Sequence, residues 1–492
     1  MSERRPASVK TNFIYNLLSN VITILAPLIT TPYISRVLGV DGVGAYSFTY
    51  SNVTYFVLLA TLGTTAFAQR EIASERNNAY RVSQIFWEVI VLRIALSVLS
   101  IGLYLTIFQR TRIDNLILVQ SVNIVCVMSD ITWFFQGLQE FKKTALRTIT
   151  IKLIFVFFTF AFVKKPEDLT LYAFGYALVQ VVANASLWLY LPKYLEKCSI
   201  SVNGIVTNIW PSFLLFIPTV ATQIYTVLDK SMIGFMTETS TQNGLYEQAE
   251  KIVRMGLTVY TAYGAVVAPK IAALKSERQD IEIKNQLNTS IRVMWLIVLP
   301  MTAGVIAISK SFVPWFYGEG YEGITPLLRI FSLLFIVVGL SNVLAVQYLV
   351  PVKRQNIFTL SVVLGATINL LMNIYLIQKY YALGAAISSV IAEAIITSIQ
   401  MYYVVSKERL FTIKEIFKPA LPYFVYSLVM LGVTLTISHF MPATVVASVL
   451  IVIVGSCLYL GLLILNKDSV TLNIVNTLIC RVKKEKQVRQ IE

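Results

Sequence analysis

The sequence is poor in charged side chains, which make up only 14% of its 492 residues, whereas hydrophobic residues make up 56%. A soluble globular chain carries about 25% charged residues. The charges that are present lie mostly between long apolar runs, a pattern typical of a protein that crosses a membrane many times. This composition excludes an ordinary soluble domain.

Histidine and cysteine are also scarce: His439 is the only histidine, and the four cysteines are Cys126, Cys198, Cys457 and Cys480. Their spacing is not that of metal ligands, so we expect free thiols, a structural histidine and no metal site. The sequence has no Walker A motif, no G-x-S-x-G motif and no histidine-based dyad. We therefore predict neither an ATP-driven pump nor an enzyme, and no cofactor.

Fourteen apolar stretches are about 20 residues long or longer, the length that crosses a bilayer as a helix. They lie near residues 12–34, 44–69, 83–108, 114–136, 144–163, 168–191, 206–233, 243–269, 288–309, 325–350, 355–378, 383–405, 420–438 and 444–465. We predict an all-α integral membrane protein with 14 transmembrane helices. Because the number is even, both termini are expected on the same side of the membrane.

Basic residues are distributed unevenly between the alternate loops. One set of loops, which includes both termini, holds 26 Lys and Arg, and the other set holds seven. The positive-inside rule therefore predicts a multi-pass protein of the bacterial cytoplasmic membrane with both termini in the cytoplasm. We assign the net charge of +15 to this asymmetry and to contact of a basic tail, residues 467–492, with anionic lipid. No nucleic-acid-binding pattern accompanies the charge.

An internal repeat has an offset of about 200 residues, or six spans. Two prolines occur in each of the first and seventh spans, and the segments after them correspond: Pro27 and Pro32 with Pro211 and Pro218, Leu38-Gly39 with Ile233-Gly234, and Gly44-Ala45-Tyr46 with Gly244-Leu245-Tyr246. Because six is even, the two halves enter the membrane in the same orientation. Parallel repeats of this kind are typical of transporters whose two lobes rock around a central site.

The span 243–269 carries four charges, at Glu247, Glu250, Lys251 and Arg254. An ionisable group at bilayer depth costs at least about 2.5–3.5 kcal/mol on insertion scales, so it normally faces protein or a water-filled cavity. Glu247 with Lys251, and Glu250 with Arg254, have the i,i+4 spacing that favours pairing on one helix. Arg254 is expected about 16 Å below the outer end of the span, near the midplane.

Other charges also lie within spans. Arg93, Lys152 and Glu393 are expected near mid-depth, and Arg147, Arg292 and Arg329 lie near span ends, where they could snorkel to the interface. Two interpretations remain open. In the first, the charges neutralise each other in inter-helix ion pairs, and this applies above all to Glu88, Asp130 and Lys152. In the second, they line a hydrated cavity with a basic bias, suited to a phosphate or an acidic sugar.

Six segments carry a resemblance to a known family. They are residues 36–46 (RVLGVDGVGAY), 226–234 (TVLDKSMIG), 244–249 (GLYEQA), 316–321 (FYGEGY), 369–373 (NLLMN) and 383–393 (LGAAISSVIAE). In this order and spacing they resemble the Wzx-type polysaccharide flippases of the multidrug/oligosaccharidyl-lipid/polysaccharide exporter superfamily. The resemblance extends from about residue 10 to residue 465.

The resemblance implies a MATE-like fold with two pseudo-symmetric six-helix lobes, residues 1–200 and 201–410, two additional helices in 411–466, and the tail. It implies that an undecaprenyl-diphosphate-linked oligosaccharide is turned to the outer leaflet by alternating access. It places Arg36, Asp229, Lys230, Glu250, Lys251 and Arg254 in the central cavity, whereas Arg93 and Glu393 are candidates by depth alone.

Particular roles follow for these residues as hypotheses. Lys251 and Arg254 would attract the diphosphate or acidic sugars, and Asp229 and Glu250 would orient them or carry coupling ions. We expect flipping to be driven by a proton or sodium gradient or by the membrane potential. Membrane lipids are expected partners, with a polysaccharide polymerase and glycosyltransferases as protein partners.

Three alternatives remain open. A flippase for lipid II or a teichoic-acid precursor would share these features. A MATE-type drug antiporter with the same fold should have an acid-dominated cavity for cations, whereas the span 243–269 is balanced. A membrane-embedded polymerase or ligase would need a long outer loop with catalytic residues, and the sequence has none.

Overall fold

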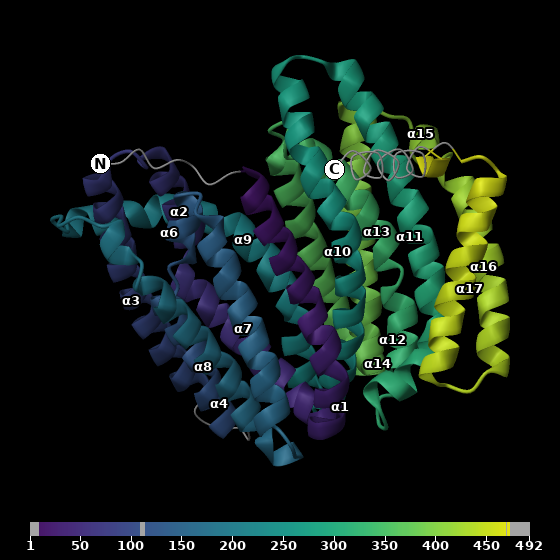
Figure 1. Ribbon diagram of the computed structural model, residues 1–492, viewed down its shortest axis with the longest axis horizontal. Helices are drawn as coiled ribbons and strands as arrows, with labels where there is room; N and C mark the ends of the chain where they lie inside the picture. The colour runs from purple at the N-terminus through teal and green to yellow at the C-terminus, as the bar shows by residue number, and fades with distance from the viewer. Residues whose placement is uncertain (1–8, 109–113, 469, 473–492) are drawn as a thin grey trace, which may run out of the picture. The chain divides into compact units, whose positions relative to one another are not determined.

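The computed structural model describes residues 9–108, 114–468 and 470–472, and every regular element in these ranges is a helix (Figure 1). Eleven helices in this part of the chain are long and apolar enough to cross a membrane. The predicted all-helical membrane class is therefore confirmed. Cys480 and residues 473–492 of the predicted tail lie outside the described residues.

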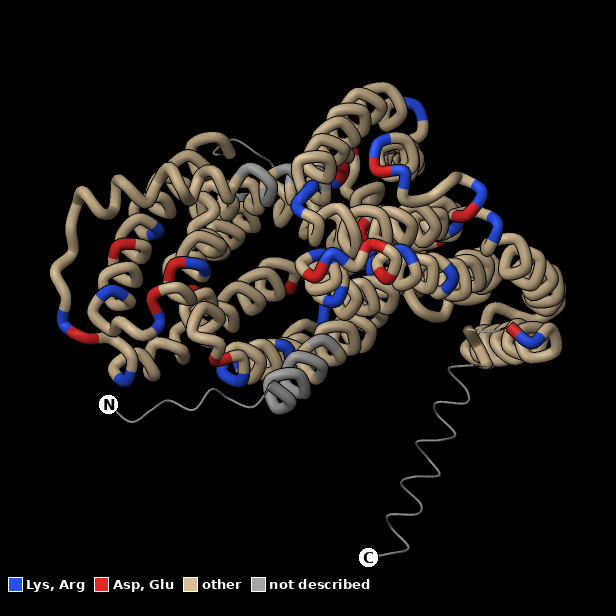
Figure 2. The backbone as a smooth tube through the Cα atoms, turned by 90° about the horizontal axis from the view of Figure 1, so that it is seen from above, with Lys and Arg blue, Asp and Glu red and all other residues tan. Residues whose placement is uncertain are grey.

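The chain divides into two compact units, Met1–Glu247 and Gln248–Glu492, and the division falls inside one helix, α10 (Thr241–Ser276). The predicted lobe boundary at residue 200 stays a prediction. Most residues along the chain are uncharged, and the charged residues occupy short stretches of it (Figure 2).

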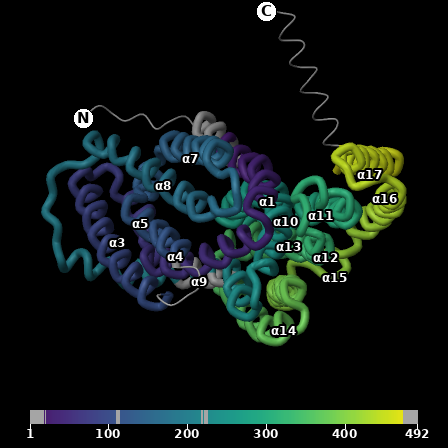
Figure 3. The backbone as a smooth tube through the Cα atoms, turned by 90° about the horizontal axis from the view of Figure 1, so that it is seen from below, coloured from purple at the N-terminus to yellow at the C-terminus, as the bar shows by residue number. Residues whose placement is uncertain are grey.

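The described residues of unit 1 form nine α-helices before α10. They are α1 (Val9–Thr61), α2 (Thr64–Ser74), α3 (Ala79–Phe108), α4 (Asp114–Gln120), α5 (Val122–Ser129), α6 (Thr132–Gly137), α7 (Phe141–Phe162), α8 (Leu169–Trp188) and α9 (Val202–Met236), with short 3-10 turns at Pro166–Asp168 and Leu191–Lys193. α1 packs against α3, α7 and α9, and α7 lies beside α8 (Figures 1 and 3). An aromatic core built on Phe86, Trp133 and Phe134 joins α3 to α6.

The helix α1 is interrupted at Gly39, whose φ of 69° and ψ of 174° are not helical. Positive φ is inexpensive only for glycine, so the Leu38-Gly39 pair of the predicted repeat is the point where the chain changes direction. The prolines Pro27 and Pro32 lie inside the helix before this break.

The predicted span 114–136 is divided into α4, α5 and α6. The chain leaves the helix at Asp130 (φ −77°, ψ 111°), where the carboxylate accepts hydrogen bonds from the backbone N–H and the hydroxyl of Thr132. An aspartate that accepts a hydrogen bond from the first N–H group of the next helix favours such a break, which the hydropathy of the span alone could not show.

Within its described part, unit 2 contains the rest of α10 and seven further α-helices. They are α11 (Asp280–Tyr317), α12 (Ile324–Phe331), α13 (Leu334–Ser341), α14 (Gln355–Tyr402), α15 (Ile413–Phe417), α16 (Ala420–Phe440) and α17 (Val445–Leu465), with π-helical turns at Asn342–Leu349 and Tyr403–Lys407. α11 packs against α16, α17 and α13. α14 is interrupted at Tyr381, where φ is 52° and ψ is −131°.

Candidate functional site

The segments 40–47 and 240–247, which the repeat relates by 200 residues, pack against each other inside unit 1. A Cβ atom added to Gly44 would fall on the carbonyl oxygen of Ser240, and one added to Gly244 would fall on the carbonyl oxygen of Val40. Adding 200 to the number of Gly44 and subtracting 200 from that of Ser240 gives the second contact, between Gly244 and Val40. Such reciprocity is the property of a two-fold interface, here between repeats of one chain.

Two side-chain pairs join equivalent positions of these segments. The hydroxyl of Thr241 donates a hydrogen bond to Asp41 Oδ1, and the hydroxyl of Ser47 donates to Glu247 Oε2 at 3.0 Å. In each pair the residue numbers differ by 200. Both pairs therefore lie on the local two-fold axis, where a residue meets its own counterpart.

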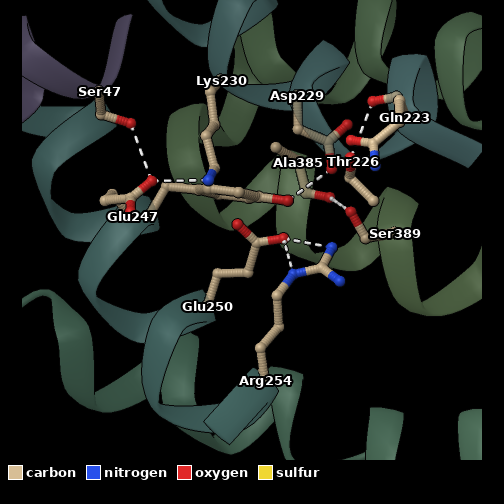
Figure 4. A network of polar contacts seen from close by, with 11 residues as sticks. Ser47, Gln223, Thr226, Asp229, Lys230, Glu247, Glu250, Arg254, Ala385 and Ser389 are labelled. Carbon is tan, nitrogen blue, oxygen red and sulfur yellow. Dashed lines mark hydrogen bonds and ion pairs between the residues drawn. The ribbon is translucent and has the colours of Figure 1, made fainter. Parts of the chain in front are cut away.

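Lys230 of α9 forms an ion pair with Glu247 of α10, with 2.6 Å between Nζ and Oε2 (Figure 4). The two side chains are 16% and 21% exposed, so water screens the pair only in part. The same Glu247 oxygen accepts the Ser47 hydrogen bond. The i,i+4 rule predicts Lys251 as the partner of Glu247. The structure adds Lys230, which a single-helix rule cannot find.

Asp229 precedes Lys230 and is buried. Its Oδ2 accepts a hydrogen bond from the hydroxyl of Tyr246, and both side chains are less than 5% exposed. Thus Asp229 and Lys230, two predicted site residues, each bind the first turns of α10. They link α9 to the segment that carries the repeat contact.

In unit 2, Arg254 binds Glu250 through Nε at 2.7 Å and through Nη2 at 2.6 Å (Figure 4). The predicted i,i+4 pair is confirmed. Its two members differ in exposure, because the side chain of Arg254 is 49% exposed and that of Glu250 is 6% exposed. Lys251, next to Glu250, is half-buried, as is Glu393 of α14.

Arg93 occupies a different place. It is fully buried, and its guanidinium donates to the hydroxyls of Thr64 and Thr65 and to the backbone carbonyl of Asp130 at 2.6–2.9 Å. The guanidinium also lies 5.2 Å from the ring of Trp133. In this arrangement Arg93 ties α3 to α2 and to the break before α6, and a role in substrate binding stays a prediction.

Two other embedded acids are held by neutral groups. Glu88, only 1% exposed, accepts hydrogen bonds from the side-chain amides of Gln84 and Asn208 at 2.9 and 3.0 Å. Asp130 accepts the two hydrogen bonds from Thr132 described above. Amide, hydroxyl and backbone N–H donors provide the hydrogen bonds of these two acids, and no close ion pair of either is present among the described residues. Asp130 still acts electrostatically on Arg93 and Arg147, so the interpretation that the embedded charges neutralise each other stays open. Arg36 is exposed and donates to the carbonyl of Pro32.

Most of the chain is similar to proteins of known families. Residues 9–275, more than half of the chain, match the family model described as "Polysaccharide biosynthesis protein". The chain belongs to the polysaccharide biosynthesis protein family. A second model, described as "Lipid II flippase MurJ", matches residues 177–455 of this family member.

One relative of this polysaccharide biosynthesis protein is the putative O-antigen transporter of Escherichia coli (strain K12). The two are 24% identical over 412 residues, which cover 81% of this chain and 97% of the relative. The predicted kinship with polysaccharide flippases is confirmed. The family and its relatives are transporters and flippases, so the prediction that the chain is not an enzyme is confirmed as well.

Two solved structures show the fold of the family member. The lipid II flippase MurJ in an inward closed conformation matches with a TM-score of 0.71 at 17% identity, covering 93% of this chain and 99% of that one. An inward-facing multidrug resistance transporter of the MATE family and the MOP superfamily matches with a TM-score of 0.59 at 11% identity, covering 83% and 95%. The predicted resemblance to the MATE fold is confirmed.

Sequence reasoning missed several residues around the predicted site. Ser47 and Tyr246 bind the acidic side chains Glu247 and Asp229, and neither was a candidate. The numbers of Ser47 and Glu247 carry the signal that would have found the first contact, because they differ by the repeat offset. Among the residues that the structure describes, no group of three or more His, Cys, Asp or Glu side chains is arranged to hold a metal ion.

Proposed function

We propose that this protein turns undecaprenyl-diphosphate-linked oligosaccharide repeat units from the cytoplasmic to the outer leaflet, for capsule, O-antigen or exopolysaccharide synthesis. The single observation that carries the proposal is the family match over more than half of a chain whose long helices are apolar. The E. coli relative, which aligns over 97% of its length, bears the name of an O-antigen transporter.

The proposal includes fourteen spans arranged as two six-helix lobes and two further helices. Each of the long apolar segments Val21–Ser74 and Gln355–Lys407 exceeds twice the length of one span and contains a non-helical residue, Gly39 or Tyr381. Counting each as two spans, and counting the 35-residue helix α9 as one, brings the eleven apolar helices to fourteen. The MATE-like fold favours alternating access between the lobes.

We assign the cavity role to Arg36, Asp229, Lys230, Glu250, Lys251 and Arg254. Arg254 is the principal candidate, because its guanidinium is half exposed while one face of it is held by the buried Glu250. A half-exposed guanidinium fixed in this way can come close to a diphosphate or an acidic sugar and attract its negative charge. A proton or sodium gradient, or the membrane potential, drives the cycle in this proposal.

The proposed location is the bacterial cytoplasmic membrane, with both termini in the cytoplasm. The positive-inside asymmetry supports this orientation. A polysaccharide polymerase on the outer side and glycosyltransferases on the inner side are the expected protein partners, since one consumes and the others build the flipped molecule.

Replacing Arg254 by Ala tests the proposed site. We expect surface polysaccharide to fall at least about tenfold at normal protein level, because a lost charge-assisted contact is worth about 1.5–3 kcal/mol. Lys275→Ala is a matched control, because Lys275 is an exposed base on the same helix that pairs with Asp280. Normal export by the Arg254→Ala protein would remove Arg254 from the mechanism.

A lipid II flippase is the second candidate, favoured by the MurJ family model over residues 177–455. The two functions differ in what accumulates when the gene is deleted. Loss of a repeat-unit flippase leaves lipid-linked oligosaccharide in the inner leaflet of viable cells. Loss of the sole lipid II flippase stops cell-wall growth and is lethal. Lethal accumulation of lipid II, rescued by this gene, would replace the first proposal by the second.

A further inference from the structure

The helix α8 carries a row of polar side chains at intervals of four residues. The row, which we call the α8 track, consists of Tyr172, Tyr176, Gln180 and Asn184. Residues four apart lie on one face of a helix. At 1.5 Å per residue the track extends about 18 Å, more than half of the hydrocarbon thickness of a bilayer. It therefore continues well into the membrane-embedded part of unit 1.

The opposite face of α8 carries the lipid-facing side chains. Large apolar residues that are 39–59% exposed lie there: Leu171, Phe174, Leu178 and Val182. With about 100° per residue, the centres of this face and of the track are about 180° apart. The track thus points toward the interior of unit 1, where four polar groups in a row need a reason other than contact with lipid.

Two tyrosines of α1 continue the track on a neighbouring helix. The ring of Tyr46 lies 5.2 Å from that of Tyr172, and the ring of Tyr50 lies 6.3 Å from that of Tyr176, both edge to face. Tyr46 and Tyr50 are themselves stacked at 5.7 Å. All four tyrosines are half-buried, so each retains some accessible surface. The rings form two layers, one helical turn apart.

The C-terminal end of the track, at Asn184, binds Arg147 of α7. Its Nη2 donates to Asn184 Oδ1, whereas its Nε is buried and has no acceptor among the described residues. No ion pair of the described residues includes Arg147. The negative charge of Asp130 stabilises this cation electrostatically without an ion pair, and the guanidinium keeps one donor, Nε, for a further acceptor. Arg147 binds the buried Asn184 near the end of α8, and snorkelling of Arg147 to the interface stays a prediction.

This arrangement matches the chemistry of a glycan attached to an acidic group. Sugar hydroxyls both donate and accept hydrogen bonds, as do the tyrosine hydroxyls and the carboxamide of Gln180. Asn184 is buried, and its amide donates to the carbonyl oxygen of Cys126 while its oxygen accepts from Arg147, so Asn184 positions Arg147. The C–H faces of sugar rings pack on aromatic rings, which offer large apolar area with a polar tip. A guanidinium binds a phosphate or a carboxylate in bidentate geometry.

We propose that Tyr172, Tyr176 and Gln180 of the α8 track, with Tyr46 and Tyr50, form the glycan-binding surface of unit 1, and that Arg147, held by Asn184, binds an anionic group of the same molecule. The proposal rests on the proposed flippase function and adds its recognition element. The anionic group is either the diphosphate or a carboxylate on a sugar. Within the track, Gln180 already donates a hydrogen bond to the Tyr176 hydroxyl at 3.2 Å, so the two polar groups are held together.

Binding to the purified full-length protein in lipid nanodiscs tests the proposal. The probes are the lipid-linked oligosaccharide extracted from cells in which the gene is deleted, the same material with its carboxyl groups reduced to alcohols, and undecaprenyl diphosphate without sugar. The variants are Tyr176→Phe, Gln180→Met and Arg147→Gln. Phe174→Leu on the lipid-facing side of α8 is the matched control, expected to bind as the wild type does.

We expect Tyr176→Phe and Gln180→Met each to weaken binding of the oligosaccharide probe about three- to tenfold, the value of one hydrogen bond. Their binding of sugar-free undecaprenyl diphosphate should not change. Wild-type affinity of both variants for the oligosaccharide would overturn the track as a glycan site. Because each variant removes a different group at nearly constant volume, a folding defect in one leaves the other as the test.

Arg147→Gln distinguishes the two anions. Weaker binding of all three probes would assign Arg147 to the diphosphate. Weaker binding of the unreduced oligosaccharide alone would assign it to a sugar carboxylate, and unchanged binding of every probe would overturn its role. A wild-type protein that binds no undecaprenyl-linked probe would instead contradict the proposed function, so the two failures are separable.

Discussion

The segments 40–47 and 240–247 have the same backbone packing and different charges. The close contacts of Gly44 and Gly244 with backbone carbonyls are equivalent under the repeat. The side chains on the local axis are not, since Asp41 faces Thr241, and Ser47 faces Glu247. One repeat has its acid at the first position, and the other has it at the second.

The difference follows from the electrostatics of a two-fold axis. In two identical segments each axial residue would meet itself, and two carboxylates at hydrogen-bonding distance repel each other. With a hydroxyl opposite each carboxylate, both pairs become donor and acceptor. Sequence divergence between the repeats therefore allows the axis to hold acids, and Glu247 then remains available to Lys230.

The largest loss of stability is expected when Gly44 or Gly244 is replaced. Comparing the two replacements tests whether the packing of the repeats is reciprocal. We expect Gly44→Ala and Gly244→Ala to reduce stability by similar amounts, about 1–3 kcal/mol or more, since each new Cβ overlaps a backbone oxygen that cannot rotate away. The measurement is the fraction of monodisperse protein that survives heating in detergent.

Gly102→Ala is the control for the glycine pair. Gly102 lies in α3, and apart from its chain neighbours and the nearby backbone of its own helix no described atom is within 4 Å of the position that its Cβ would take. Alanine there should leave stability unchanged or raise it by about 0.4–1 kcal/mol, because it reduces the entropy of the unfolded chain. Tolerance of alanine at only one of Gly44 and Gly244 would show that the contact is not reciprocal.

A smaller effect is expected from the ion pair, which exists on one side of the comparison only. Lys230→Met should cost about 1.5–3 kcal/mol, the usual value of a hydrogen bond to a charged group, because it leaves a largely buried carboxylate without this cation. Glu247→Gln in the Lys230→Met protein should recover part of the loss. The thermal stabilities of Lys230→Met, Glu247→Gln and the double variant, each compared with the unchanged protein, form a double-mutant cycle. If the loss in the double variant equals the sum of the two single losses, Lys230 and Glu247 are not directly coupled.

The sequence predicted those features that depend on local periodicity. The ranges of α8, α16 and α17 agree with the predicted spans within a few residues, and the i,i+4 spacing found the pair of Glu250 with Arg254. The repeat offset located the segments that meet on the axis. All of these are patterns within one helix or between two similar stretches of chain.

The remaining features depend on contacts between helices, which no local pattern encodes. The pair of Lys230 with Glu247 joins two helices, and Arg93 is held by two threonines of α2 and a carbonyl freed at the Asp130 break. The α8 track was visible in the sequence as four polar residues at i+4 spacing. A search for charged groups at bilayer depth passed over it, because its members are neutral.

The smallest effects are expected from the two hydrogen bonds on the local axis, Ser47 with Glu247 and Thr241 with Asp41. Comparing them shows how exposure to solvent changes the contribution of a hydrogen bond to stability. Ser47 is 3% exposed and donates to a mostly buried carboxylate, whereas Asp41 is exposed. Ser47→Ala should therefore cost about 1–2 kcal/mol, since the acceptor loses a donor that water replaces poorly. Thr241→Val should change stability by less than about 0.5 kcal/mol, because water solvates Asp41 in place of the lost hydroxyl. The same thermal assay measures both variants. Equal losses of stability would mean that water reaches the two hydrogen bonds to the same extent.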